Sequence, residues 1–156
     1  MTSPDRTAWR TVLEAQSALM RLYESEMQAS SGISLAWYDV LIHLSEARDG
    51  TMRMSELASA LLLSRSWLTR RIDGMEAAGL VERCRASDDG RGVCARLTGE
   101  GRTMCRKATL IHVGSIRRHF LAYLEPGQIE TIDQCFARIE AHARISLNRK
   151  GTLRPA

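Results

Sequence analysis

The stretch that decides the fold runs from Met54 to Gly101 and reads MSELASALLLSRSWLTRRIDGMEAAGLVERCRASDDGRGVCARLTGEG. Apolar residues recur at helical spacing in two short runs, which the segment LLLS separates. Two short apolar-containing segments then flank a turn that is rich in Asp and Gly. This order predicts two short helices followed by a β-hairpin with a projecting tip.

The second of these helices is predicted to have one apolar and one polar face. Leu68, Ile72 and Met75 lie on the same side at i, i+4 and i+7 spacing. Ser64 is placed to cap the first turn, and Gly79 stands where a left-handed C-cap is needed. The opposite face is small and rich in hydrogen-bond donors, namely Arg65, Ser66, Thr69 and Arg70.

The predicted hairpin pairs Leu80–Arg85 with Val93–Thr98 around the turn sequence ASDDGRG. Pairing Val81 with Leu97 puts two apolar side chains together on one face. The same register places two further pairs on the other face, Glu82 with Arg96 and Cys84 with Cys94. Because the turn is longer than two residues, we expect its tip to project with Arg91 exposed.

This arrangement favours binding to double-stranded DNA. A helix fits the major groove, where Ser, Thr and Arg near its N-terminus reach base edges and phosphates. An arginine on a narrow projecting tip suits the negative potential of the minor groove. An arginine-rich helix face is most often simply solvated, but the order helix, turn, helix, hairpin favours the DNA-binding interpretation here.

The same residues resemble the MarR family of winged helix-turn-helix transcriptional regulators. The similarity lies in LASALLLSRSWLTRRIDGMEAAGLVER, which matches the recognition helix and its GLV-x-R exit, and in the closing Leu97-Thr98-x-x-Gly101 signature. In the family the wing sequence is usually Asp-Arg-Arg. This chain has Asp89-Gly90-Arg91, so Gly90 replaces one of the two arginines of the wing. The resemblance implies a mainly α fold with a small β-hairpin wing and long dimerisation helices.

The flanking sequence predicts helices on both sides of this unit. Apolar periodicity predicts a helix from Pro4 to about Ala29, a second one capped by Ser34, a third from Gly99 to about Tyr123 and a last one starting near Pro126. Thr51–Arg53 is predicted to form a short strand beside the wing. We therefore expect a single domain over 1–156, with a winged lobe at about 34–98, dimerisation helices at about 4–30 and 99–147, and a frayed tail at 148–156.

The terminal helices carry apolar stripes that the winged unit is too small to cover, and exposed stripes of this size usually mark an interface. They predict a twofold homodimer, as the resemblance also implies. Twofold symmetry in turn predicts a pseudo-palindromic operator with half-sites about one helical turn apart.

Composition is compatible with this interpretation without proving it. The chain has 156 residues, a net charge of +4 and a pI of about 9.2. Nearly all of the positive charge is arginine, a bias that codon usage alone can produce. No N-terminal signal segment and no transmembrane run is recognisable, so a cytoplasmic protein without membrane contact is expected.

The resemblance and the helix face together define the predicted DNA-binding residues. The major groove is assigned Ser64, Arg65, Ser66, Thr69 and Arg70. Trp67 and Arg71 flank this surface and are expected either to contact phosphates or to pack against the lobe. Asp89 is expected to brace the wing and Arg91 to enter the minor groove. The Arg91→Ala substitution should then weaken binding at AT-rich flanks and reduce the salt slope by about one unit.

The resemblance further implies a small-molecule effector, often an aromatic or phenolic anion, in a crevice between the dimerisation helices and the DNA-binding lobe. The candidate lining residues are Met20, Trp37, Tyr38 and His43, with an arginine as counter-ion. Aromatic and Met residues at helical spacing are also typical of plain core. The family is most often repressive, so a repressor that a ligand releases is expected.

Two alternatives remain open at this stage. Cys84 and Cys94, flanked by Arg83 and Arg85, suggest a redox switch, although a disulfide straight across a ladder is strained and the peroxide sensors of the family use a cysteine in the first helix. The second alternative is a winged-helix module that binds another protein and does not bind DNA. Enzyme motifs are absent from the sequence, and neither a cofactor nor a metal is called for, because the four histidines lack recognisable ligand spacing.

Overall fold

A computed structural model describes residues 3–85 and 92–149 of the chain. In chain order its helices and strands are α1 (Ser3–Ser31), α2 (Leu35–Glu46), the 3-10 turn η1 (Arg48–Gly50), β1 (Thr51–Arg53), α3 (Met54–Ala60), α4 (Arg65–Ala77), β2 (Val81–Arg85), β3 (Val93–Leu97), α5 (Gly99–His119), η2 (Leu121–Tyr123) and α6 (Pro126–Arg149). The predicted mainly α fold with a small β-hairpin wing is confirmed.

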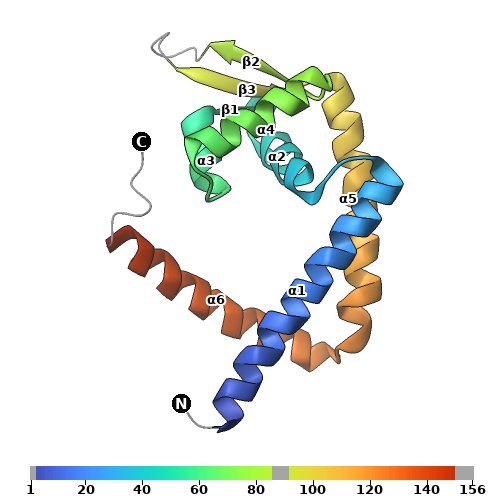
Figure 1. Ribbon diagram of the computed structural model, residues 1–156, viewed down its shortest axis with the longest axis vertical. Helices are drawn as coiled ribbons and strands as arrows, with labels where there is room; N and C mark the ends of the chain where they lie inside the picture. The colour runs from blue at the N-terminus through green and yellow to red at the C-terminus, as the bar shows by residue number, and fades with distance from the viewer. Residues whose placement is uncertain (1–2, 86–91, 150–156) are drawn as a thin grey trace.

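A winged lobe forms one end of the molecule, and long helices form the other (Figure 1). We call the segment from α2 to β3 the lobe, and the hairpin of β2 and β3 the wing. The core of the lobe is formed by fully buried side chains from several elements, including Leu41, Leu57, Leu68, Ile72 and Met75. These residues hold α4 against α2 and the sheet, so that the other side of α4 is left exposed.

The link between α3 and α4 is a tight turn. Leu62 adopts a left-handed conformation with φ of 55°, which is costly for a residue with a β-carbon. Ser64 then caps α4, since its side chain accepts a hydrogen bond from the backbone N–H of Trp67 at 3.4 Å. At the far end Gly79 has φ of 72°, and Leu80 donates its N–H to the carbonyl of Met75 at 2.9 Å.

The three strands form an antiparallel sheet in the order β1-β3-β2. The predicted register of the wing is confirmed, with Val81 opposite Leu97 and the pairs Glu82–Arg96 and Cys84–Cys94 on the other face. The predicted strand at Thr51–Arg53 is also present and pairs with β3. The tip of the wing, with Asp89 and Arg91, lies outside the described residues.

Helices α1 and α5 run side by side below the lobe (Figure 1). Glu26 of α1 joins them, because its carboxylate accepts hydrogen bonds from Ser115 at 2.6 Å and from Arg118 at 2.7 Å. Nε2 of His119 lies 2.7 Å from the other carboxylate oxygen. Ser115 is almost completely buried, so this contact is part of the packing between the two helices.

Two predicted helix ends were wrong by a few residues. Helix α5 ends at His119 rather than near Tyr123, because Phe120 leaves helical geometry at φ −125° and a short 3-10 turn follows. Pro126 restricts the residue before it, which favours a break at this point. The last helix continues to Arg149, beyond the predicted end at 147.

Helix α6 diverges from α5 and crosses α1 in the view of Figure 1. Large apolar side chains on α1 and α6 are exposed, among them Trp9, Leu13, Met20, Phe136, Ile139 and Ile145. No helix in the described part of the chain combines the length and the apolar character needed to cross a membrane.

Candidate nucleic-acid interface

The recognition helix α4 presents its polar face to solvent, as its sequence pattern predicts. Leu68, Ile72 and Met75 are fully buried, which fixes the rotation of the helix about its axis. Arg65, Ser66, Thr69 and Arg70 are all exposed. Core packing rather than any contact on the polar face therefore decides which side chains a nucleic acid would meet.

The hydroxyl groups of the first turn are already organised within the helix. The Ser64 side chain, besides its capping bond, lies 3.1 Å from the hydroxyl of Ser66. The Thr69 hydroxyl donates to the carbonyl of Arg65 at 2.9 Å. Ser64 thus acts first as the N-cap, while Ser66 and Thr69 keep acceptor lone pairs for an external donor.

Trp67 and Arg70 form a second feature of this face. Trp67 is 63% exposed, although a side chain of this size usually finds cover in a folded protein. The guanidinium of Arg70 lies over its ring at 5.9 Å from the centroid, within the range of a cation–π contact. The indole ring limits the positions that the Arg70 side chain takes in front of the helix.

Arg71 differs from the other predicted contacts because it is half-buried. Asp39 of α2 has a raised pKa because of its burial, and the positive charge of Arg71 acts in the opposite direction. Arg71 therefore lies close enough to the carboxyl group of Asp39 to act on it, and it is less exposed than Arg70.

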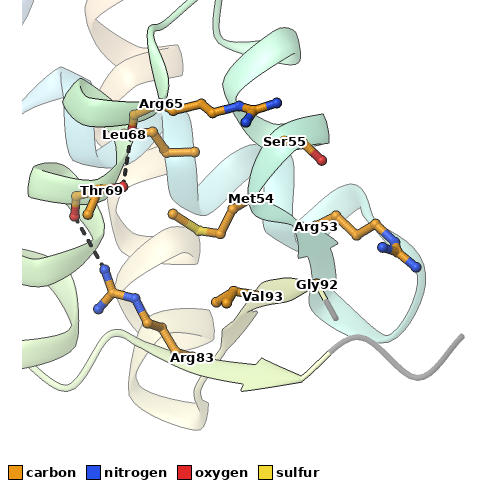
Figure 2. Close-up of a pocket in the computed structure, with 9 residues that line it drawn as sticks. All are labelled: Arg53, Met54, Ser55, Arg65, Leu68, Thr69, Arg83, Gly92 and Val93. Carbon is orange, nitrogen blue, oxygen red and sulfur yellow. Dashed lines mark hydrogen bonds between the residues drawn. The ribbon is translucent and has the colours of Figure 1, made fainter. Parts of the chain in front are cut away.

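A groove of about 480 Å³ separates the recognition helix from the wing, and Figure 2 shows the side chains that line it. Leu68, Met54 and Val93 form the apolar part of the lining, whereas Arg53 and Arg65 extend toward the open side. Ser55, Thr69, Arg83 and Gly92 complete the lining. Arg53 and Ser55 were not predicted as interface residues, because nothing in the sequence places the start of α3 beside α4.

Arg83 fixes the wing to the recognition helix. Its guanidinium donates to Asp73 Oδ1 at 2.6 Å, to the carboxylate of Glu76 and to the carbonyl of Thr69 at 3.4 Å. Its backbone N–H donates to Glu76 Oε1 at 2.9 Å. These hydrogen bonds lower the pKa of Glu76. The position of the wing relative to α4 is thus set by a partly exposed cluster of charged groups as well as by the hairpin.

The four residues predicted to line an effector crevice come from two helices. Met20 lies exposed on α1, while Trp37, Tyr38 and His43 lie on α2. Trp37 packs against the recognition helix, since a β-carbon at Gly74 would come within 3.1 Å of its ring. His43 Nδ1 lies 2.7 Å from the carbonyl of Asp39.

Tyr38 instead belongs to an aromatic cluster that sequence reasoning missed. His112 of α5 contacts Tyr38 at 5.2 Å and Tyr23 of α1 at 5.6 Å between ring centroids. Its buried Nδ1 has no hydrogen-bond partner within the described residues, and burial lowers the pKa of the imidazole. Because Tyr23, Tyr38 and His112 are distant in sequence, the sequence did not indicate that they are in contact. The spacing of each residue on its own helix indicated only that it could be buried.

The expected activation of the wing cysteines by Arg83 and Arg85 was wrong. Arg83 is engaged with Asp73 and Glu76 on the other face of the sheet. Burial, followed by the neighbouring Cys94, raises the pKa of Cys84 rather than lowering it, and Arg96 is the arginine that opposes this shift. Within the described residues no cluster of three or more His, Cys, Asp or Glu side chains offers a metal site.

With this geometry established, the comparison with solved structures identifies the family. AbsC, a MarR family transcriptional regulator from Streptomyces coelicolor, is 38% identical, with a TM-score of 0.87 over 92% of this chain and 97% of that chain. The chain belongs to the MarR family of transcriptional regulators. A model of the MarR family also matches residues 31–92, which include most of the lobe.

Two other relatives agree with the MarR assignment. Sco3205, a MarR family regulator from Streptomyces coelicolor solved in complex with DNA, is 29% identical with a TM-score of 0.85 over 92% of this chain and 89% of that one. The HTH-type transcriptional regulator PrsX from Escherichia coli is 28% identical over 118 residues, which are 76% of this chain and 70% of PrsX. Members of the MarR family are regulators and not enzymes.

The MarR signature Leu97-Thr98-x-x-Gly101 has a clear structural role in this chain. Thr98 caps α5 by accepting from the N–H of Gly101 at 2.9 Å, and its hydroxyl donates to the carbonyl of Gly79 at 2.7 Å. A β-carbon on Gly101 would lie 2.0 Å from the carbonyl oxygen of Leu80. The signature therefore locks the exit of the wing onto the end of the recognition helix.

Proposed function

We propose that this MarR-family protein is a repressor that binds a pseudo-palindromic DNA operator as a homodimer and is released by a small ligand. The observation that carries DNA binding is the exposed, donor-rich face of α4 beside a groove that Arg53 and Arg65 line. A helix face with Ser, Thr and Arg side chains suits base edges and phosphates of the major groove. The relative Sco3205, which was solved with DNA, supports this proposal.

The homodimer is supported by the exposed apolar side chains of the long helices. Trp9 and Leu13 on α1, together with Phe136 and Ile139 on α6, leave a large apolar area in water if the chain stays alone. A second copy of the chain is the simplest partner to bury such a surface, because in a twofold dimer the same apolar patch of both copies is buried at the interface. Two recognition helices related by this symmetry then face successive turns of the major groove.

The effector is proposed to act at the junction of the long helices and the lobe. Tyr23, Tyr38 and His112 come from α1, α2 and α5, so a molecule that binds there contacts the long helices and the lobe together. The unpaired Nδ1 of His112 offers a hydrogen bond to a phenolic or carboxylate group. Release follows if the ligand changes the distance between the two recognition helices.

The test is selection of bound sequences from a random duplex pool with purified protein at near-physiological salt. Recovery of a pseudo-palindrome with half-sites about one helical turn apart is the expected result. The selected site then serves to screen aromatic and phenolic acids for release, with His112→Phe as a variant that keeps the ring and removes the ring nitrogens.

Other outcomes of this selection contradict the proposal. An unenriched pool, together with no salt-dependent shift on nonspecific DNA, favours the protein interaction module, since any protein that contacts phosphates must release counter-ions. Enrichment of a single half-site by a monomeric protein would disprove the homodimer while leaving DNA binding in place.

A further inference from the structure

The two wing cysteines stand directly opposite each other in the β-ladder. Cys84 of β2 is the register partner of Cys94 of β3, and Cys94 is in turn paired with Arg53 of β1. Directly opposed residues of antiparallel strands have Cα atoms roughly 4.5 to 5.5 Å apart, which lies within the range that a disulfide accepts. The strain of a disulfide straight across the ladder makes such a bond easier to reduce, as a reversible switch requires. Both cysteines are free thiols in this structure.

The two thiols differ in their access to solvent. Cys84 is half-buried, whereas Cys94 is only 5% exposed. Both line one groove of about 630 Å³ on the outer face of the sheet. A reagent that enters this groove therefore meets Cys84 first, while Cys94 lies underneath and next to it.

The groove carries an excess of positive charge. Its lining includes four arginines, Arg48, Arg53, Arg85 and Arg96, against the two carboxylates of Asp49 and Glu56. Arg96 also donates to Glu82 at 3.3 Å. A groove of this composition favours a small anion over a small cation. Guanidinium groups bind carboxylates in particular, because their planar donors match the two oxygens.

We propose that Cys84 and Cys94 form a dithiol–disulfide switch in the wing, which is oxidised by a small disulfide that bears carboxylate groups. Cys84 is the entry thiol and Cys94 the resolving thiol. The regulatory part of this inference rests on the proposed DNA-binding function, whereas formation of the disulfide does not.

The chemistry proceeds in two exchange steps. The thiolate of Cys84 attacks one sulfur of the disulfide R–S–S–R, so that a Cys84–S–S–R bond forms and RS⁻ leaves; the proton lost by Cys84 converts it to RSH. The thiolate of Cys94 then attacks Sγ of Cys84 and expels the second R–S⁻, which takes up the proton of Cys94. One disulfide bond is broken and one is formed, with two molecules of RSH released.

The resting pair is not reactive by itself. Burial and the adjacent Cys94 raise the pKa of Cys84, which keeps it protonated, and the thiolate is the attacking species. Reaction therefore depends on an oxidant that the groove holds next to the sulfur. This explains why the arginines matter more for selection of the oxidant than for activation of the thiol.

The new bond would act on the part of the wing that approaches DNA. The Cys84–Cys94 pair lies one ladder step before Arg85–Val93, where the strands leave the sheet. A covalent link there fixes the twist of the hairpin and changes the position of the Arg85–Val93 pair relative to α4. We expect operator affinity to fall about tenfold, as on loss of one good contact of roughly 1.4 kcal/mol.

The test compares three disulfides, using the full-length reduced protein. Oxidised glutathione carries carboxylates, 2-hydroxyethyl disulfide is neutral and cystamine is cationic. Intact mass measures how fast the internal disulfide forms, and operator binding is measured before and after oxidation. The Cys94→Ser variant should accumulate the mixed disulfide at Cys84, and Cys84→Ser should form neither product in the wing. Cys135→Ser is the control for the half-buried cysteine of α6.

The expected result is that oxidised glutathione reacts fastest and that the double variant Arg48→Gln/Arg85→Gln removes this preference. The inference is overturned if cystamine reacts as fast as oxidised glutathione with the wild-type chain, or if the adduct is found only at Cys135. A wing disulfide that leaves operator affinity unchanged disproves the switch. Reduced protein that binds no DNA would refute the proposed function instead, because the mass measurement does not depend on it.

Discussion

Arg83 and Glu76 are joined twice, once through the backbone N–H of Arg83 at 2.9 Å and once through its guanidinium. The first residue lies on the wing strand β2 and the second on the recognition helix α4. This double contact makes the wing and the recognition helix one rigid unit. The proposed binding of DNA by both elements depends on their mutual position, to which this pair contributes.

The Arg83→Ala substitution should therefore weaken operator binding without removing a phosphate contact. Asp73 and Glu76 lose their partner, and we expect about a tenfold loss of affinity. The dependence of binding on salt should keep its slope, because Arg83 acts through the position of the wing. Arg83→Lys keeps the positive charge but lacks the planar set of N–H donors of the guanidinium, so its operator affinity should lie between those of the wild type and Arg83→Ala. A slope that falls together with the affinity would show that Arg83 contacts DNA itself.

Arg70→Ala tests a direct contact of the recognition helix. Arg70 is exposed beside Trp67, so it is available to a phosphate. We expect the salt slope to fall by about one unit for each chain that contacts the operator. Arg144→Ala is the matched control, since it removes the same charge from an exposed pair with Glu140 on α6. An equal effect of both substitutions would mean that only net charge matters.

Gly101→Ala should destabilise the fold strongly. The added β-carbon would lie 2.0 Å from the carbonyl oxygen of Leu80 and 2.8 Å from a methyl of Leu97, so the backbone must shift. We expect a loss of about 3 kcal/mol in the free energy of unfolding, at the upper end for overpacking. Gly99→Ala meets nothing within 4 Å and should be almost neutral. Urea denaturation of both variants makes the comparison, and equal midpoints would contradict it.

Glu26→Gln tests the joint between α1 and α5. Hydrogen bonds from Ser115 and His119, together with Arg118, lower the pKa of Glu26 from 4.5 to about 2. We expect the substitution to cost about 2 kcal/mol at pH 7, in the range for hydrogen bonds to charged groups.

The pH dependence of this loss has a definite sign. A lowered folded pKa stabilises the folded chain above the unfolded value, so the full difference between wild type and Glu26→Gln should be present above pH 4.5 and disappear as the pH falls toward about 2. Denaturation at several pH values measures it, with Glu140→Gln as an exposed control. A difference that stays constant down to the lowest pH would rule out a role for the Glu26 charge.

The local structure of the lobe was predictable because apolar spacing, helix caps and strand alternation each act over only a few residues. The spacing of Leu68, Ile72 and Met75 sets the buried face of α4, and Ser64 and Gly79 mark its ends. The wing register followed from alternation, since a slip by one residue would turn Val81 and Leu97 to solvent. The donors on the exposed face of α4 were identified by the same reasoning.

The contacts between distant segments were not predictable from any such pattern. Arg83 was expected to activate Cys84, although the alternation of side chains along a strand already places the two on opposite faces. That Arg83 meets Asp73 and Glu76 there depends on how α4 packs against the sheet. Arg53 joins both the recognition groove and the cysteine groove, since β1 lies beside β3 at the edge where these surfaces meet. His112 meets Tyr23 and Tyr38 only through the packing of three helices.

The sequence by itself thus determined the elements, the wing register and the donor-rich face of the recognition helix, since helix caps, periodicity and turn residues act locally. The tertiary structure alone decided which charges meet, because salt bridges such as Arg83–Asp73 and Arg118–Glu26 join different helices and strands, the second pair 92 residues apart. It also decided which cysteine is accessible and which is covered. Burial and proximity depend on the packing of the whole lobe, and no short stretch of sequence carries that information.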